Sequence, residues 1–257
     1  MCTLAVLWKV HPAAPLIVAQ CRDELLARPA LDLDRWRTPR GVDVVSGRDV
    51  VAGGTWFGVG PRMVCALTNR HDALGPRRGN LSRGALVVEA LEQPDVAAVE
   101  RKLAAIPGAE YGPFSLLACD GDELVYADNS AAELVVTRVQ PGVHVLGNRN
   151  LDNPLDPVVV TVGAAVRALV DTDEDTLVTS LRAILGRHGD GWPCVHRTVP
   201  VPGAIEGVPN YGTRSAGVLV WRAQSPRLWT HPSVPHDADG WREASALLGV
   251  APIREAP

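Results

Sequence analysis

The sequence lacks the features that assign many chains to a class at first sight. None of its apolar runs reaches the length of a membrane-spanning helix. Its start has neither the basic region nor the long apolar segment of a secretory signal, because the apolar run 3–8 is short and Lys9 interrupts it. These absences predict a cytoplasmic protein without membrane insertion.

Cysteine is sparse, and its spacing fits neither disulfides nor metal. The chain has 5 cysteines, an odd number, and no CxxC pair, so reduced thiols are expected. Cys194-Val195-His196 and segment 231–236 lack a partner pair at zinc spacing, so we expect no metal and no resident cofactor. Four cysteines lie in apolar stretches and are expected to be packed thiols: Cys21, Cys65, Cys119 and Cys194.

An excess of basic charge is also missing. The formal net charge is -4 and the arginines are scattered, so no nucleic-acid partner is expected. The glycine-rich stretch 53–58 fits neither a dinucleotide-binding nor a P-loop pattern. With 46% hydrophobic residues over 257 positions, the chain can bury a sizeable core, and we expect one domain over 1–257.

The feature of greatest chemical interest is Cys2. It becomes the N-terminal residue if Met1 is removed, which a small second residue normally permits. Cys2 then carries both a thiol and a free α-amine, and an α-amine pKa of about 8 suits a general base at neutral pH. Because the thiolate is the reactive form of cysteine, an adjacent base can activate it as a nucleophile. A cysteine at this position can also be without any role.

The first two expected strands place charged residues beside Cys2. Segments 3–10 and 15–20 are apolar and β-branched, and the connection around Pro12 predicts an antiparallel hairpin. A hairpin symmetric about this turn pairs residues whose numbers sum to about 25. Asp23 would then lie opposite Cys2, with Arg22 one step away. A slip of one residue would exchange the side chain that faces Cys2.

The remaining pattern predicts an α+β protein, with helices outside stacked antiparallel sheets. Segment 25–43 has many Pro and Arg residues and little periodicity, so a long surface loop is expected. Further strands are expected at 56–59, 63–67, 115–120, 123–129, 133–139, 142–148 and 212–221. Helices are expected after Ser82 and Asp95, over 157–188 and, in the tail, near 241–248. A proline- and glycine-rich loop is expected over 192–210.

Several motifs together resemble the NRDE family, also called the Transport and Golgi organisation protein 2 family. They are MCTLAVLWKVHPAAPLIVAQCRDE, GRDVVAGGTWFGV, ALTN, SRGALV, HVLGNRNLDNP and YGTRSAGVLV, in the family's order. The resemblance extends to about Val220, and the tail from about 222 matches less well. It implies a four-layer αββα sandwich similar to N-terminal-nucleophile hydrolases, with a cysteine exposed by methionine removal. Cys21 replaces the asparagine of the family's Asn-Arg-Asp-Glu.

A more distant similarity is to choloylglycine hydrolases and penicillin V acylases. Those enzymes combine an N-terminal cysteine, an Arg and an Asp after the first hairpin, two asparagines and a late arginine. The matching positions imply a catalytic set here: Cys2, Arg22, Asp23, Asn69, Asn148 and Arg214. Each also has a plain structural reading, because Arg22 and Asp23 could be a surface ion pair and the asparagines could be turn residues.

The resemblance leaves two classes of function open. In the first, a cysteine N-terminal-nucleophile hydrolase cleaves a non-peptide C–N (amide) bond of a small acylated substrate. In the second, the same cleft carries haem or another small ligand without catalysis, since eukaryotic relatives are linked to haem mobilisation and Golgi organisation. An axial haem ligand would be His, Cys, Met or Tyr, and the sequence nominates none of them.

Overall fold

The computed structural model describes residues 2–71, 79–130, 134–202, 204–205, 207–232 and 238–249. In this part of the chain the strands form two antiparallel sheets of seven strands each. The first sheet has the order β10-β1-β2-β12-β13-β14, with β11 paired to β12. Its members are β1 Thr3–His11, β2 Ala14–Leu25, β10 Gly142–Leu146, β11 His196–Arg197, β12 Tyr211–Trp221, β13 Arg227–His231 and β14 Arg242–Glu243.

The second sheet follows chain order from β3 to β9. Its strands are β3 Ala30–Arg37, β4 Asp43–Asp49, β5 Phe57–Val59, β6 Val64–Asn69, β7 Phe114–Cys119, β8 Leu124–Asp128 and β9 Val135–Arg138. Every neighbouring pair is antiparallel. Each connection can therefore be short or carry a helical excursion without a crossover.

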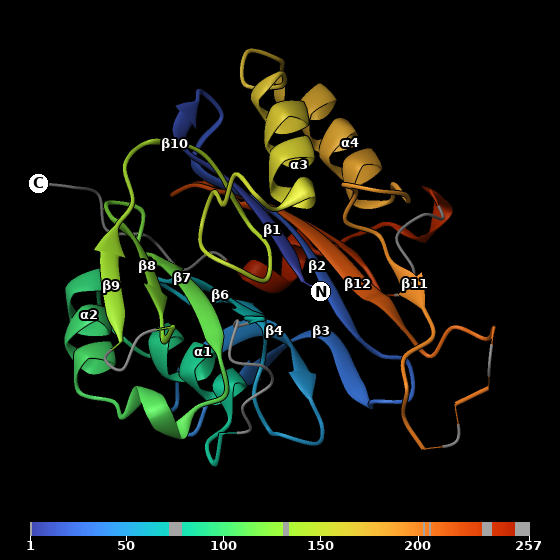
Figure 1. The fold of residues 1–257 in the computed structure, drawn as a ribbon. Coiled ribbons are helices and arrows are strands. Elements are labelled where there is room, and N and C mark those ends of the chain that lie inside the picture. Colours follow the sequence, from blue (N-terminus) through green and yellow to red (C-terminus); the bar gives the residue numbers. More distant parts are fainter. Residues whose placement is uncertain are drawn as a thin grey trace, which may run out of the picture.

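Helices cover the outer face of each sheet (Figure 1). α3 Pro157–Arg167 and α4 Glu174–Leu185 pack on the first sheet, and α1 Arg83–Leu91 and α2 Val96–Ala104 pack on the second. As expected, Asp95 caps α2 by accepting a hydrogen bond from the backbone N–H of Ala98. Among the described helices, none combines the length and apolar character needed to cross a membrane.

Three hydrophobic cores separate the four layers. Leu7 and Val218 pack against α3 and α4, Val6 and Leu219 face the second sheet, and Leu116 packs under α1. Because neighbouring residues of a strand point to opposite faces, buried strands between two layers are apolar on both sides. The expected α+β fold with four αββα layers is confirmed.

The register of the first hairpin differs from the expected one by one residue. The turn pairs His11 with Ala14, as expected, but a bulge between Trp8 and His11 shifts the ladder so that Leu4 lies opposite Gln20. Lys9 takes a positive φ of 52° at this bulge. The shift is required because the side chains of both strands that enter the inter-sheet core have even numbers, and an unbulged ladder would pair even with odd positions. The next pair beyond Thr3–Cys21 places Arg22, rather than Asp23, beside Cys2.

Two other expectations were wrong. Segment 25–43 is not one long loop, because it contains all of β3 and the first residue of β4. β3 is an edge strand with mostly exposed or half-exposed side chains and its own bulge, so no apolar alternation marks it. The expected tail helix is only a 3-10 turn, Ser245–Leu248, and the tail also contributes β13 and β14.

The start of α1 touches the turn before β5 through main-chain atoms. The Thr55 N–H donates to the Gly84 carbonyl at 3.2 Å. A Cβ added at Gly54 would lie 2.3 Å from the carbonyl carbon of Gly84 and 2.6 Å from the nitrogen of Ala85. The absence of a side chain at Gly54 therefore sets the separation of this turn from α1.

We predict that Gly54→Ala lowers the free energy of unfolding by about 1–3 kcal/mol, because the new methyl group would overlap backbone atoms that cannot move alone. Gly53→Ala is the matched control. Its Cβ would meet no atom within 4 Å, so only the positive φ of 70° opposes it, at about 1–2 kcal/mol. Denaturant unfolding measures both. A smaller loss for Gly54→Ala than for Gly53→Ala would contradict the close contact.

Candidate active site

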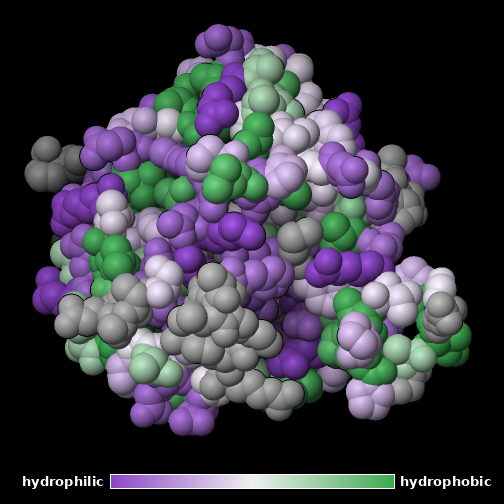
Figure 2. Space-filling view, in the orientation of Figure 1, coloured by the Kyte–Doolittle hydropathy of each residue, from purple (hydrophilic) through white to green (hydrophobic). Residues whose placement is uncertain are grey.

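A cavity of about 570 Å³ opens where the ends of several strands meet the start of α1. Cys2 and segment 22–24 line it from the first sheet, and Ala52 and segments 54–56 and 79–84 line it from the turn before β5 and the start of α1. Figure 1 places the N-terminal end of β1 between the two sheets, and Figure 2 shows hydrophilic residues gathered across the middle of the same face. A cavity of this size and polarity suits a small polar ligand.

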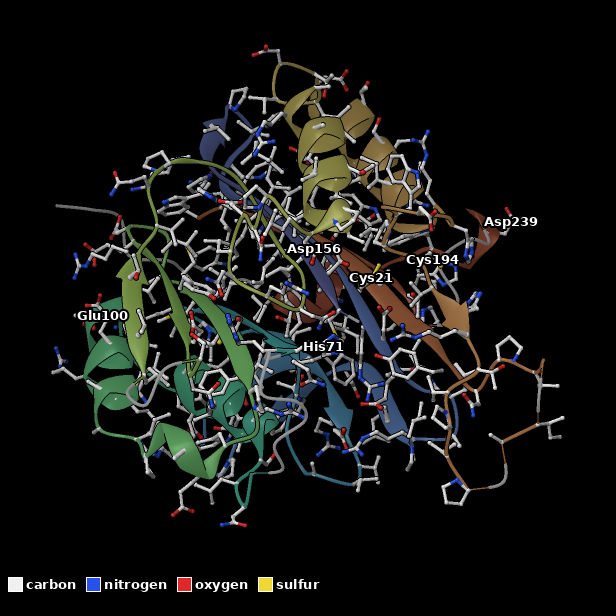
Figure 3. All side chains as sticks on the ribbon, in the orientation of Figure 1. Cys21, His71, Glu100, Asp156, Cys194 and Asp239 are labelled. Carbon is white, nitrogen blue, oxygen red and sulfur yellow. The ribbon has the colours of Figure 1, made fainter. Side chains whose placement is uncertain are left out.

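Cys2 is the partly exposed cysteine of the chain, and the other four are buried as expected. Cys21 faces the helical layer, where its thiol contacts the Leu185 carbonyl at 3.7 Å (Figure 3). The Cys2 Sγ donates to the carbonyl oxygen of Asp23 at 3.8 Å. Burial raises the pKa of the Cys2 thiol, as does the Asp23 carboxylate, whereas Arg22 lowers it. The thiol is therefore neutral at pH 7 and needs a base before it can react.

Arg22 is held between the two sheets. Its residue is 4% exposed, and its guanidinium lies over the Trp56 ring at 4.2 Å from the centroid. A Cβ at Gly47 would lie 2.6 Å from the Cη2 atom of this ring, so Gly47 makes room for the ring to lie over β4. Asp49 and Glu24 neutralise the charge from 3.7 and 3.9 Å. Stacking and these two carboxylates together fix a buried cation beside Cys2.

Asp23 points to the opposite face of β2 from Arg22, because the two residues are consecutive in a strand. Its Oδ1 accepts a hydrogen bond from Thr213 Oγ1 at 2.7 Å. Burial raises the pKa of the Asp23 carboxyl to about 6, against the opposing effect of the Thr213 hydroxyl. A bulge in β12 between Thr213 and Ser215 brings the Thr213 side chain to this face.

The two asparagines occupy different positions. Asn69, the last residue of β6, lines the cavity and its side-chain amide has no hydrogen bond to any described residue. The Asn148 Nδ2 donates to the Asn69 carbonyl at 2.5 Å, and the His71 N–H donates to the Asn148 carbonyl at 2.8 Å. Continuing the β1–β10 ladder from Leu4–Leu146 places Asn148 beside Cys2. Asn148 therefore braces Asn69 from the neighbouring strand and does not line the cavity itself.

Arg214 does not join the cavity wall. It occupies the bulge of β12, its guanidinium donates to the Leu26 carbonyl, and it lines a separate small pocket that shares Arg22 and Trp56. The structure thus brings Cys2, Arg22, Asp23 and Asn69 around one cavity, with Asn148 behind Asn69 and Arg214 on the far side of Arg22.

Sequence reasoning missed five charged or aromatic side chains of the described cavity wall: Glu24, Arg28, Asp49, Trp56 and Arg83. Arg28 binds Asp49 through two hydrogen bonds, of 2.7 and 3.2 Å. Asp49, Trp56 and Arg83 all lie inside motifs that carry the family resemblance, so those motifs held a signal for them. Thr213, the hydroxyl partner of Asp23, lies in another of these motifs.

We predict that Arg22→Gln slows alkylation of Cys2 by iodoacetamide at pH 7 and shifts the alkylation midpoint to higher pH, because Arg22 lowers the pKa of the thiol. A slowing of about threefold to tenfold corresponds to half a pKa unit or one unit. Arg62→Gln, an exposed arginine outside the cavity, is the control. Alkylation of the Arg22 variant at the wild-type rate would show that this cation does not tune the thiol.

The raised pKa of Asp23 also predicts a pH-dependent stability. In the folded protein the pKa is about 6, against an ordinary value of 3.8, so the stabilising contribution is complete below about pH 4 and is lost as the pH rises through 6. Asp23→Asn should remove this loss, worth about 3 kcal/mol at most. Denaturant unfolding of both proteins between pH 4 and 8 measures the difference. Parallel stability curves would contradict the assignment.

Comparison with known proteins places the chain in a family. Residues 1–229 match the model of the family Transport and Golgi organisation 2. Among curated proteins no sequence matches the chain. Among solved structures it is similar to the C2A mutant of conjugated bile acid hydrolase from Clostridium perfringens, with a TM-score of 0.55, 9% identity and 95% and 92% of the two chains covered.

A second similar structure is the Caenorhabditis elegans ortholog of N-acylethanolamine-hydrolyzing acid amidase. It has a TM-score of 0.52 and 14% identity, over 93% of this chain and 94% of that one. At such identities the likeness concerns the fold, which is that of N-terminal-nucleophile hydrolases. From the match over residues 1–229, the chain belongs to the Transport and Golgi organisation 2 family.

Proposed function

We propose that this protein is a cysteine N-terminal-nucleophile hydrolase that cleaves the non-peptide C–N (amide) bond of a small acylated substrate. The observation that carries the proposal is the position of Cys2. It is the partly exposed cysteine, it lines the cavity of about 570 Å³, and a buried arginine is its neighbour across β1 and β2. The fold shared with a conjugated bile acid hydrolase and an acid amidase also supports it.

The reaction begins with removal of Met1, which frees the α-amine of Cys2. This amine takes the proton of the thiol, and the thiolate attacks the acyl carbon to form a tetrahedral oxyanion. The side-chain amide of Asn69, which is not engaged by any described residue, donates to that oxyanion. The protonated α-amine gives its proton to the leaving amine as the C–N bond breaks, and water then hydrolyses the thioester to a carboxylic acid.

The other residues of the set position and tune these groups. Asp23, held by Thr213, accepts from the Cys2 α-amine once its carboxyl is ionised. Arg22 favours the thiolate, while Asn148 acts as a positioning residue by holding the Asn69 carbonyl. Arg214 donates to the Leu26 carbonyl and lines a small pocket together with Arg22. Its role is to secure the chain at Leu26 rather than to contact substrate.

The rival proposal is a haem or small-ligand carrier. Among the described residues that line the cavity, Cys2 alone is of a type that serves as an axial haem ligand. The described wall is strongly charged, with three arginines and three carboxylates, whereas cofactor sites for large apolar groups have mainly apolar walls. We therefore favour hydrolysis.

We predict that Cys2→Ser loses activity by about a hundredfold or more on any N-acyl amide that the wild type hydrolyses, because a hydroxyl is less acidic and less nucleophilic than a thiol. The mature N-terminus is first established by intact mass. Turnover across a panel of N-acyl amides and binding of haem are then measured for both proteins. Cys21→Ala, which alters the neighbouring cysteine outside the cavity, is expected to keep full activity.

The two proposals give opposite results. Turnover that is lost with Cys2, together with haem binding that is weak or independent of it, supports the hydrolase. No turnover by wild type across the panel, with tight haem binding that Cys2→Ser abolishes, would reject it in favour of the carrier. Retention of Met1 on active protein would exclude the α-amine as the base.

A further inference from the structure

One cation in the cavity wall has no counter-ion. Arg83 makes no ion pair with any described residue, and its guanidinium donates one hydrogen bond, from Nη1 to the Pro113 carbonyl at 3.0 Å. A guanidinium has five N–H donors, so four have no acceptor among the described residues. Burial lowers the pKa of Arg83, against the opposing effects of Cys2 and Glu24, although Glu24 forms no ion pair with it. A partly buried cation without a partner is a cost that a bound anion would remove.

The place of Arg83 in its helix adds to this cost. It is the first residue of α1, where the aligned peptide dipoles already produce a positive potential. The first turn of α1 contains no acidic residue, and the side chain of Ser82 caps no backbone N–H. The Ser82 hydroxyl is buried without a hydrogen-bond partner among the described residues. A negative charge at this end of the cavity would complement the Arg83 cation and the positive end of the helix dipole, and it could accept a hydrogen bond from the Ser82 hydroxyl.

The neighbouring charges compensate one another and leave Arg83 as the excess. Arg28 is bound by Asp49, and Glu24 lies 3.7 Å from Arg28 and 3.9 Å from Arg22. Two arginines thus share two carboxylates. Arg22 is 4% exposed, and its guanidinium lies 3.7 Å from the Asp49 carboxylate and 3.9 Å from the Glu24 carboxylate, so its charge is already compensated within the same wall. Asp23, the third carboxylate of the described wall, is held by Thr213 on the other face of β2. Among the described residues of the wall Arg83 is therefore the arginine without a carboxylate partner, and one such charge suits a monoanion better than a dianionic phosphate.

We propose that the substrate carries a carboxylate close to the acyl carbon, and that Arg83 at the start of α1 binds this carboxylate while Cys2 attacks. The planar fork of a guanidinium matches the two oxygens of a carboxylate, which gives orientation as well as affinity. The substrates expected are N-acyl amino acids or monoamides of dicarboxylic acids. This inference rests on the proposed function for the identity of the nucleophile, but the anion site itself can be tested separately.

Iodoacetate and iodoacetamide form a matched pair of probes for Cys2. In both, the thiolate displaces iodide from the CH₂ group, but only iodoacetate carries a carboxylate. We expect Arg83→Gln to slow alkylation of the mature protein by iodoacetate about tenfold, the factor of a charge-assisted hydrogen bond, and by iodoacetamide less than about twofold. Taking the ratio of the two rates cancels any change in the pKa of Cys2. Arg83→Lys should fall between, because it keeps the charge and loses the fork, and Arg62→Gln should match wild type.

An equal effect of Arg83→Gln on both probes would overturn the carboxylate site and leave the nucleophile in place. Failure of Cys2 to react with either probe would instead overturn the proposed function. In that case the anion site is tested in the Cys2→Ala protein by thermal unfolding with monomethyl succinate, its neutral analogue dimethyl succinate and inorganic phosphate. A rise in Tm with the monocarboxylate alone, lost in Arg83→Gln, supports the site. Equal shifts with the neutral analogue, or a shift with phosphate alone, would overturn it.

Discussion

The candidate site depends on one buried cation held between two sheets. Arg22 comes from the first sheet, yet its guanidinium rests on Trp56, which belongs to the second sheet's side of the molecule. The ring can lie there because Gly47 has no side chain beneath it. Loss of any of these three groups would allow the arginine to move relative to Cys2. The electrostatics of the thiol therefore follow from the packing of the two sheets as a unit.

Burial acts on the thiol and on Asp23 in the same direction, since it favours the neutral form of both. Arg22 opposes it at the thiol, and Thr213 opposes it at the carboxyl. At neutral pH the Cys2 thiol is therefore protonated, and the thiolate forms only when a base within the protein takes its proton. This arrangement suits a nucleophile that is activated only when its own base is free.

The fold class and most elements could be predicted from the sequence, but the register of the hairpin could not. β1 and β2 are buried on both faces, so apolar side chains occur at odd and even positions alike and do not reveal which set faces which core. The turn at Pro12 predicted one pairing, and the bulge at Lys9 changed it. β3 was missed for the opposite reason, since an exposed edge strand has no buried face to mark it.

Some of the site residues could likewise be predicted from the sequence, and others could not. The positions of Cys2, Arg22, Asp23 and Asn69 around one cavity agree with the resemblance, because strand ends carry them together. Only the structure showed that Asn148 holds the Asn69 carbonyl and that Arg214 lies outside the cavity wall. Arg83 lies inside a motif of the family resemblance, but the sequence could not single it out, because its importance lies in the absence of a counter-ion among the described residues, which depends on where the other charges are placed.

The contact between Gly54 and Gly84 gives the cavity two walls of different character. One wall is fixed main chain, since the turn before β5 and the start of α1 touch through backbone atoms and cannot be rearranged by a change of rotamer. Another part of the wall includes the long side chain of Arg28, which is 29% exposed and has several rotatable bonds. Selectivity among substrates of different length would then be adjusted at Arg28, while the glycine wall keeps the same reference distance to Cys2 for all of them.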